Sequence, residues 1–188
     1  MTKSFSLICA LVTTFIWGTA FIAQDTGMDN IGPLTFNAAR FLVGFITILP
    51  FAFFFEKQKI IKEINLNKSK FFKYLVIMGV SLFLGTSLQQ ASLQYTNVAN
   101  AAFFTVFYVP LVPILLFFIY SQKVHWSIWP SIVLCIYGVY LLSNFSDAEI
   151  MKGDALVILC SLFWALHIIF AGKFMETFNI PVFYAALQ

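Results

Sequence analysis

Long apolar runs alternate with short polar gaps along the whole chain. Six of these runs carry few charges, and each is close to the roughly 20 residues that a helix needs to cross a bilayer core. They cover about residues 4–23, 34–55, 71–90, 98–120, 128–145 and 154–172, and a seventh begins at Pro181. The pattern predicts a series of membrane-spanning helices.

The gaps between the runs contain residues that end and start helices. Residues 29–33 read Asp-Asn-Ile-Gly-Pro and residues 179–181 read Asn-Ile-Pro, which is typical of turns and helix caps. The gap at 56–70 is longer, polar and basic. We interpret it, together with Lys73, as a connection at the cytoplasmic surface of the membrane.

The composition excludes a soluble globular protein. Of the 188 residues, 61% are hydrophobic and 10% are charged, whereas soluble domains carry about 25% charged residues. The chain also has 24 phenylalanines, which a domain of this size cannot bury because small domains hide too little of their surface. We expect an all-α polytopic membrane protein without room for a separate enzyme domain.

Positive charge predicts the orientation. Six of the eleven basic residues lie between Lys57 and Lys73, and we interpret this cluster as a membrane surface, with no nucleic-acid partner. Basic residues are retained on the cytoplasmic side of spanning helices. With a cytoplasmic amino terminus, nine basic residues lie inside and Lys152 alone lies outside, so we expect a multi-pass protein of the cell inner membrane. A signal peptide is the competing interpretation of the first run, because Lys3, an apolar stretch and small residues also begin such peptides.

An internal repeat recurs at an offset of about 147 residues. Residues 15–18, Phe-Ile-Trp-Gly, align with residues 162–165, Leu-Phe-Trp-Ala, and each is followed by a loop, a proline and a new helix start. Five predicted helices separate the copies, so the second copy runs in the opposite direction, as in the inverted repeats of secondary transporters. Chance similarity between two apolar helices is the alternative. We divide the chain into residues 1–145, a first repeat of five helices, and 146–188, the start of a second.

The amino-acid sequence of several segments resembles the drug/metabolite transporter superfamily, in particular its EamA-type, ten-helix members. The resemblance rests on residues 15–21, on Pro33 with residues 38–42, on residues 91–102 leading to Pro110, and on residues 137–142. Residues 121–123 read Ser-Gln-Lys where that family commonly has a glutamate. The resemblance implies an inverted-repeat helical transporter fold of which this chain is a truncated or partial copy, with the first repeat and the first helix of the second.

Three residues inside the predicted spans are candidates for contact with a solute. Trp17 and Trp164 lie past the middle of their helices, and in an inverted pair both approach the midplane from opposite sides. His167 follows Trp164 by three residues and shares its helix face, where it could bind substrate or take a proton. The alternatives are packing for the tryptophans and, for the histidine, a neutral ring satisfied by a carbonyl or a neighbour.

Five further residues carry the remaining hypotheses. Arg40 is a charge inside a span and therefore a functional candidate, or it extends outward or pairs with Asp25 or Asp29. Thr105 and Tyr108 could hydrogen-bond a ligand, although Tyr108 could equally bond a neighbouring helix. Pro110 and Pro113 remove amide donors and predict a kink, either a hinge with freed carbonyls or a bend without function. The polar residues 89–100 are interpreted mostly as a solvated loop and cap.

We therefore expect a secondary transporter, a probable exporter or permease, that moves a small organic metabolite or drug-like solute by alternating access. We expect no enzyme activity, no cofactor and no metal site, because the spans hold no nucleophile with its base and no cluster of metal ligands. The expected partners are the lipid bilayer, a small-molecule substrate and a coupling proton or counter-solute, and self-association is left open. A non-transporting membrane scaffold, partner subunit or degenerate fragment is the alternative.

Overall fold

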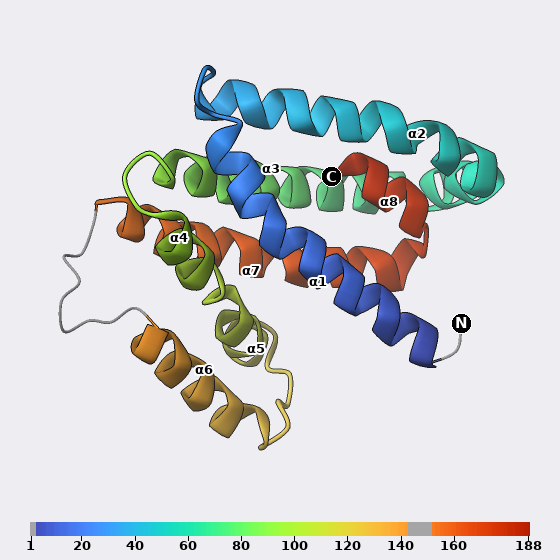
Figure 1. The fold of residues 1–188 in the computed structure, drawn as a ribbon. Coiled ribbons are helices and arrows are strands. Elements are labelled where there is room, and N and C mark those ends of the chain that lie inside the picture. Colours follow the sequence, from blue (N-terminus) through green and yellow to red (C-terminus); the bar gives the residue numbers. More distant parts are fainter. Residues whose placement is uncertain (1–2, 143–151) are drawn as a thin grey trace.

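The chain folds into helices joined by short turns (Figure 1). The structure is a computed structural model that describes residues 3–142 and 152–188, and these residues contain no strand. The helices are α1 (Lys3–Thr26), α2 (Pro33–Leu66), α3 (Lys68–Ser92), α4 (Val98–Thr105), α5 (Tyr108–Tyr120), α6 (Ile128–Leu142), α7 (Lys152–Phe178) and α8 (Pro181–Leu187). The expected all-α fold is confirmed.

Five of the described helical stretches are long and apolar enough to cross a membrane. They are α1, α2, α3, the stretch Val98–Tyr120 that contains α4 and α5, and α7. The described part of α6 is shorter, at 15 residues, and the predicted end of this helix at 145 lies outside the described residues. The division predicted at 145/146 lies there too and stays a prediction. The chain is a polytopic helical membrane protein.

The prediction that residues 56–70 form a connection between two helices is wrong, because most of this stretch is helical. Helix α2 continues to Leu66, and Asn67 alone separates it from α3. The reason is an apolar face within the basic stretch: Ile60 is buried in a cluster with Phe71 and Phe178, and Ile64 packs against the same cluster. Because side chains three and four residues apart share one helix face, this stretch is stable as an amphipathic helix and not as a loop.

Helices α3 and α7 pack against each other along their whole length. Buried or half-buried residues follow a spacing of alternately three and four on both helices, which is the pattern of coiled-coil-like helix packing. On α3 they are Phe71, Leu75, Met78, Leu82, Gly85, Gln89 and Ser92, and on α7 Gly153, Val157, Cys160, Trp164, His167, Ala171, Phe174 and Phe178. We call these two rows the α3–α7 seam. Its two helices run in opposite directions, since Phe71 meets Phe178 at one end and Gly153 meets Ser92 at the other.

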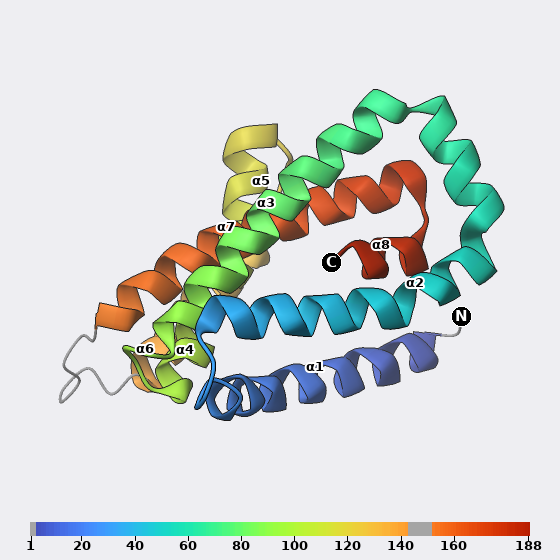
Figure 2. The ribbon, with the colours of Figure 1, turned by 90° about the horizontal axis from the view of Figure 1, so that it is seen from above.

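The first helices of the two predicted repeats run in opposite directions. Figures 1 and 2 both show α1 and α7 running past each other with opposite polarity, and α8 opposite in direction to α2. This is the arrangement of an inverted repeat. Helix α2 contains Pro50, and Figure 2 shows that its later part turns away from its first part before it enters α3.

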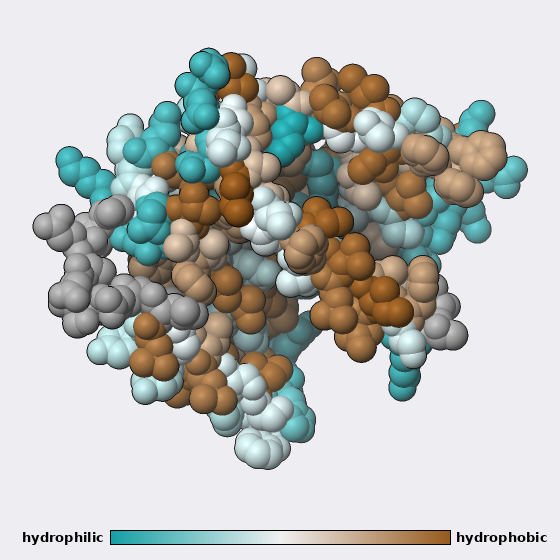
Figure 3. All heavy atoms as spheres, viewed as in Figure 1, coloured by the Kyte–Doolittle hydropathy of each residue, from teal (hydrophilic) through white to brown (hydrophobic). Residues whose placement is uncertain are grey.

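The apolar surface of the molecule is extensive. Figure 3 shows hydrophobic side chains along α1 and hydrophilic ones gathered at the turn between α1 and α2 and at the far end of α2. Along α1, Phe15 is 73% exposed and Leu11 is 63% exposed. A face of this kind is suited to lipid, because large exposed apolar patches are rare on soluble monomers.

Candidate functional site

Trp17 of α1 and Trp164 of α7 meet in the middle of the molecule. Their ring centroids are 6.4 Å apart and their planes are inclined by 50°, within the range of aromatic pairs that attract each other. Gly85 of α3 lies behind Trp164, and a Cβ atom at Gly85 would lie 3.6 Å from Trp164 Cδ1. The small residue thus lets α3 approach closely, while Trp17 keeps 56% of its surface exposed. The pair is therefore packed against α3 through Trp164 and exposed at Trp17.

His167 extends this aromatic group by one helical turn. Its ring lies 6.1 Å from the Trp164 ring at 90°, and its Nδ1 lies 3.1 Å from the carbonyl oxygen of Met78 on α3. Because a carbonyl can only accept, Nδ1 donates the hydrogen bond and Nε2 is the acceptor of the neutral ring. The structure thus places His167 against a neighbouring carbonyl, in the core of the α3–α7 seam.

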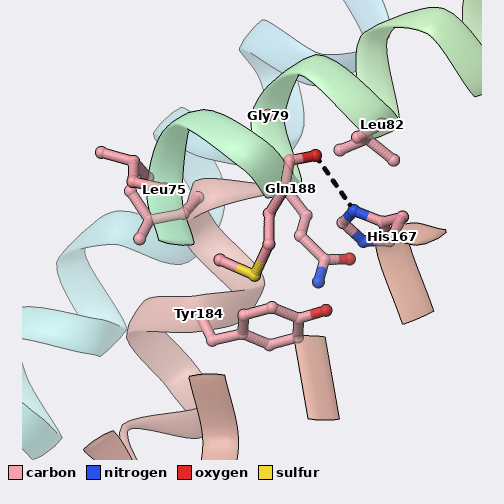
Figure 4. A pocket seen from close by; sticks show the side chains of 8 residues that line it. Leu75, Gly79, Leu82, His167, Tyr184 and Gln188 are labelled. Atoms are coloured by element: carbon pink, nitrogen blue, oxygen red, sulfur yellow. Dashed lines mark hydrogen bonds between the residues drawn. The ribbon is translucent and has the colours of Figure 1, made fainter. Parts of the chain in front are cut away.

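A small pocket opens beside the imidazole, between α3, α7 and α8. Its walls are mostly apolar, and Figure 4 shows the side chains of Tyr184 and Gln188 pointing toward His167. Among the residues that the structure describes, two buried donors have no hydrogen-bond partner: Gln188 Nε2, which lines this pocket, and Trp164 Nε1, which does not line it. Unpaired buried donors are uncommon in native structures. The Gln188 donor could therefore bond an acceptor that enters the pocket.

Thr105 joins the same region from α4. It is buried, donates a hydrogen bond of 2.7 Å to the Ala101 carbonyl and accepts one of 2.9 Å from Gln89 Nε2. Its neighbour Phe104 packs in one cluster with Cys160 and Trp164 of α7. The hydroxyl of Thr105 is thus already engaged within the protein.

The helix break predicted near the prolines lies at Val106 and Phe107, between α4 and α5. Pro110 is buried and has no amide proton to give to the Val106 carbonyl. That carbonyl is not free, however, because it accepts a 2.9 Å hydrogen bond from the amide of Val109. The expected freed carbonyl at Val106 is therefore wrong. Pro113 lies within α5, and Tyr108 is the half-buried first residue of that helix.

Arg40 is half-buried on α2 and is held by Asn37 instead of an acidic residue. Its Nη2 donates to Asn37 Oδ1 at 2.9 Å, and Asn37 Nδ2 donates in turn to the Thr86 carbonyl of α3 at 3.1 Å. The guanidinium carbon also lies 5.0 Å from the ring centroid of Phe41, the distance of a cation–π contact. In the part of the chain that the structure describes, no ion pair joins Arg40 to Asp25 or Asp29.

Two glutamines that the sequence pattern assigned mostly to a solvated loop lie in the core. Gln89 is 5% exposed and Gln90 is 0% exposed. Gln90 Nε2 donates to the backbone carbonyl of Gln24 at the end of α1, 3.2 Å away. Within the described part of the chain, the side-chain oxygens of Gln24 and Gln90 have no hydrogen-bond partner. The interpretation holds for Gln94, which is exposed, and for Asn97, which caps α4. The signal that sequence reasoning missed is spacing, because Gln89 continues the α3–α7 seam one turn beyond Gly85.

The first turn of α7 docks onto the turn that follows α3. The buried Asp154 accepts a short hydrogen bond from the Thr96 hydroxyl, and the Gly153 amide donates to the Tyr95 carbonyl at 3.3 Å. A Cβ atom at Gly153 would lie 2.7 Å from the Ser92 carbonyl oxygen. Only glycine fits this approach, so the start of α7 is attached firmly to the turn that follows α3.

The groups that the structure gathers can stack and hydrogen-bond. It brings together Trp17, Trp164 and His167, and Thr105 lies next to Phe104, which packs in one cluster with Trp164. Among the described residues, neither Arg40 nor Tyr108 makes a ring contact with the tryptophan pair. Within residues 3–142 and 152–188, no three His, Cys, Asp or Glu side chains gather as metal ligands. The arrangement is suited to holding a small molecule by its rings and polar atoms.

Relatives of the chain are transporters of unassigned substrate. It is 29% identical to an uncharacterized transporter of Archaeoglobus fulgidus, over 89% of this chain and 49% of that protein. It is 26% identical to an uncharacterized transporter of Clostridium kluyveri, over 94% of this chain and 58% of that protein. The chain thus spans about half the length of the curated relatives it matches. No solved structure matches it.

The family comparison agrees with the fold and with the resemblance seen in the sequence. Residues 4–144 match the EamA-like transporter family, a stretch that includes α1 to α6 and most of the described chain. Membership accounts for the apolar helices within the matched stretch. The chain belongs to the EamA-like transporter family.

Proposed function

We propose that this chain forms part of a secondary transporter that moves a small organic solute across the membrane by alternating access. The observation that carries the proposal is the meeting of Trp17 and Trp164, which occupy matching positions in the two repeats. Transporters built from inverted repeats bind solute near the midplane between the repeats. The exposed part of Trp17 provides an apolar, stacking surface there.

Polar groups next to the tryptophan pair support binding of a solute that also carries polar atoms. Trp164 and His167 share one face of α7. Among the described residues Trp164 Nε1 has no hydrogen-bond partner, and Nε2 of His167 is the acceptor of the neutral ring. Thr105 lies on α4 next to Phe104, with its hydroxyl bonded to Gln89 and Ala101. Each buried polar atom without a partner costs roughly 1–3 kcal/mol. A solute that supplies the missing partner recovers this free energy, which favours a bound state.

The break between α4 and α5 supports movement. A helix interrupted at Val106 and Phe107 can change its angle there, with Pro110 preventing the regular helix from closing again. We propose Pro110 and Pro113 as the hinge, an exporter or permease as the type of transporter, and a proton or a counter-solute as the coupling partner. We also propose location in the cell inner membrane with the amino terminus in the cytoplasm, supported by the lysine distribution.

The test is a growth screen of cells with and without the chain, against toxic amino acids, purines and cationic drugs. For a compound to which the chain confers tolerance, we expect Trp17→Ala and Trp164→Ala to abolish tolerance. The matched control is Trp126→Ala, because Trp126 is 73% exposed and lies in the turn before α6. Membrane levels of each variant are compared by immunoblot.

Two outcomes contradict the proposal. If both tryptophan variants reach the membrane and confer full tolerance, the solute does not use this pair. If wild-type chain reaches the membrane and changes tolerance to no compound, and also fails to move radiolabelled forms of the same panel in proteoliposomes, the non-transporting scaffold is the better description.

A further inference from the structure

Positive charge is concentrated where α2 passes into α3. We call residues 56–73 the basic corner. All six of its lysines are exposed: Lys57, Lys59, Lys62, Lys68, Lys70 and Lys73. Its two acidic residues, Glu56 and Glu63, offset only two of these six positive charges, and Glu56 Oε2 also accepts a 2.8 Å hydrogen bond from the amide of Phe183.

The basic corner is a fixed part of the fold. Ile60 is 3% exposed and packs with Phe71, Phe178 and Ile180, so the lysine-bearing stretch of α2 is anchored to α3, α7 and α8. Figure 2 shows the corner projecting at one end of the molecule, where α2 has turned away from its first part. The lysines therefore present a preformed charged surface, for which little ordering is needed on binding.

Aromatic side chains adjoin the lysines. A shallow hollow on α2 is lined by the consecutive residues 53–59, which are three phenylalanines followed by Glu56, Lys57, Gln58 and Lys59. Phe54 is 82% exposed and Phe55 is 67% exposed. An apolar end next to a cationic end has the chemistry that is complementary to an anionic amphiphile.

We propose that the basic corner is a binding site for anionic phospholipid. The acyl chains lie against Phe55, and the phosphate lies between Lys59 and Lys62, which follow Phe55 by four and seven residues and share its helix face. The other lysines add to the attraction. An acidic protein or a nucleic acid would meet the same charge without an apolar group to cover Phe55, so this exposed phenylalanine beside the lysines favours lipid. This proposal does not depend on solute transport.

The test measures lipid binding to the purified chain in detergent by native mass spectrometry. The probes are dioleoylphosphatidylglycerol, which is anionic, and dioleoylphosphatidylcholine, which has no net charge. The variant Lys57→Gln/Lys59→Gln/Lys62→Gln removes three charges from the corner. The control Lys3→Gln/Lys123→Gln/Lys152→Gln removes three charges from other exposed positions, so both variants have the same net charge.

We expect the chain to prefer the anionic lipid, and the corner variant to bind it on the order of 100-fold more weakly, taking about fivefold per lysine. The control variant keeps its affinity. Raising the salt concentration weakens wild-type binding, because ions screen exposed charges. Free glycerol phosphate does not compete, since it has no acyl chains to occupy the hollow.

Any of three results would overturn the proposal: equal binding of the two lipids, full affinity in the corner variant, or an equal loss in the control variant. Competition by free glycerol phosphate would identify a phosphate site and not a lipid site. If the glutamine variant does not fold, two other variants test the proposal: Lys57→Arg/Lys59→Arg/Lys62→Arg and Lys68→Gln/Lys70→Gln. The arginine variant should keep the preference for anionic lipid and the double variant should reduce it, and the reverse of either result contradicts the site.

Discussion

The substitution Gly153→Ala tests how the start of the second repeat is attached to the first. An added Cβ would lie 2.7 Å from the Ser92 carbonyl oxygen, 2.7 Å from the Tyr95 carbonyl carbon and 2.8 Å from Thr96 Cβ. Two of these atoms belong to the backbone, so the strain cannot be relieved by rotating one side chain. We expect the first turn of α7 to move outward.

The magnitude follows from two terms. Overpacking by one methyl group in a tight site costs about 1–3 kcal/mol. Outward movement also weakens the hydrogen bond between Thr96 and Asp154, and bonds to charged groups contribute about 1.5–3 kcal/mol. Part of this second term survives because the turn can adjust, so we expect a total loss of about 2–3 kcal/mol. For a chain of this length that corresponds to a melting temperature lower by about 4–12 °C.

The assay is thermal unfolding in detergent, followed by a thiol-reactive dye. Cys160 is buried in the α3–α7 seam two turns after Gly153 and becomes reactive when the seam opens, whereas Cys9 is exposed throughout, so Cys9→Ser and Cys135→Ser remove the background. Gly172→Ala is the control in the same helix, because nothing lies within 4 Å of its added Cβ. This control should raise stability by up to about 1 kcal/mol, since alanine favours helix. An unchanged or raised melting temperature for Gly153→Ala would refute the tight docking of α7.

Two further predictions concern the other end of the molecule. Phe178→Ala should lower the free energy of unfolding by about 3–5 kcal/mol, because Phe178 is 1% exposed. The control Phe72→Ala, at a residue that is 49% exposed, should change it little. The same thermal assay checks both variants, and equal effects would contradict the packing described. Glu56→Ala should lower the free energy of unfolding by about 1–2 kcal/mol, because it leaves the Phe183 amide without its acceptor, and hydrogen exchange should rise at that amide. Glu176→Ala, on an exposed part of α7, is the matched control. Protection of the amide that persists in Glu56→Ala would show that the carboxylate is not the acceptor.

Local signals were sufficient for most helix starts. Helices α2 and α8 begin at Pro33 and Pro181, where a proline fits the first turn. Helix α4 begins at Val98 because Asn97 accepts a hydrogen bond from the amide of Asn100. Each of these starts depends on a few adjacent residues, so it could be predicted from the sequence without knowledge of the rest of the fold.

The candidate site was predicted only where the repeat linked distant residues. The offset of about 147 residues placed Trp17 and Trp164 at equivalent positions, and their rings lie 6.4 Å apart. No such link existed for Gln90, whose burial depends on Gln24 of α1. The helical continuation of α2 beyond Phe55 likewise depends on Phe178 and Ile180, which lie more than a hundred residues later and cover Ile60. A polar or amphipathic stretch can be placed only when the surface that covers it is known.

The α3–α7 seam shows why this matters for function. The end of the seam near the basic corner is closed by large apolar side chains such as Phe71, Phe174 and Phe178. If the helices part there, these side chains lose contacts with protein and gain contacts with lipid tails, which are equally apolar, so the cost is small. The other end of the seam contains the small or polar residues Gly85, Gln89 and Ser92 beside the apolar Val157 and Cys160. The polar groups of this end lose hydrogen bonds if the helices part in lipid. That end can separate only where water or a solute replaces the lost partners. Because Gly153 and Asp154 hold the polar end together, changes there should alter seam opening more than equal losses of stability at the apolar end.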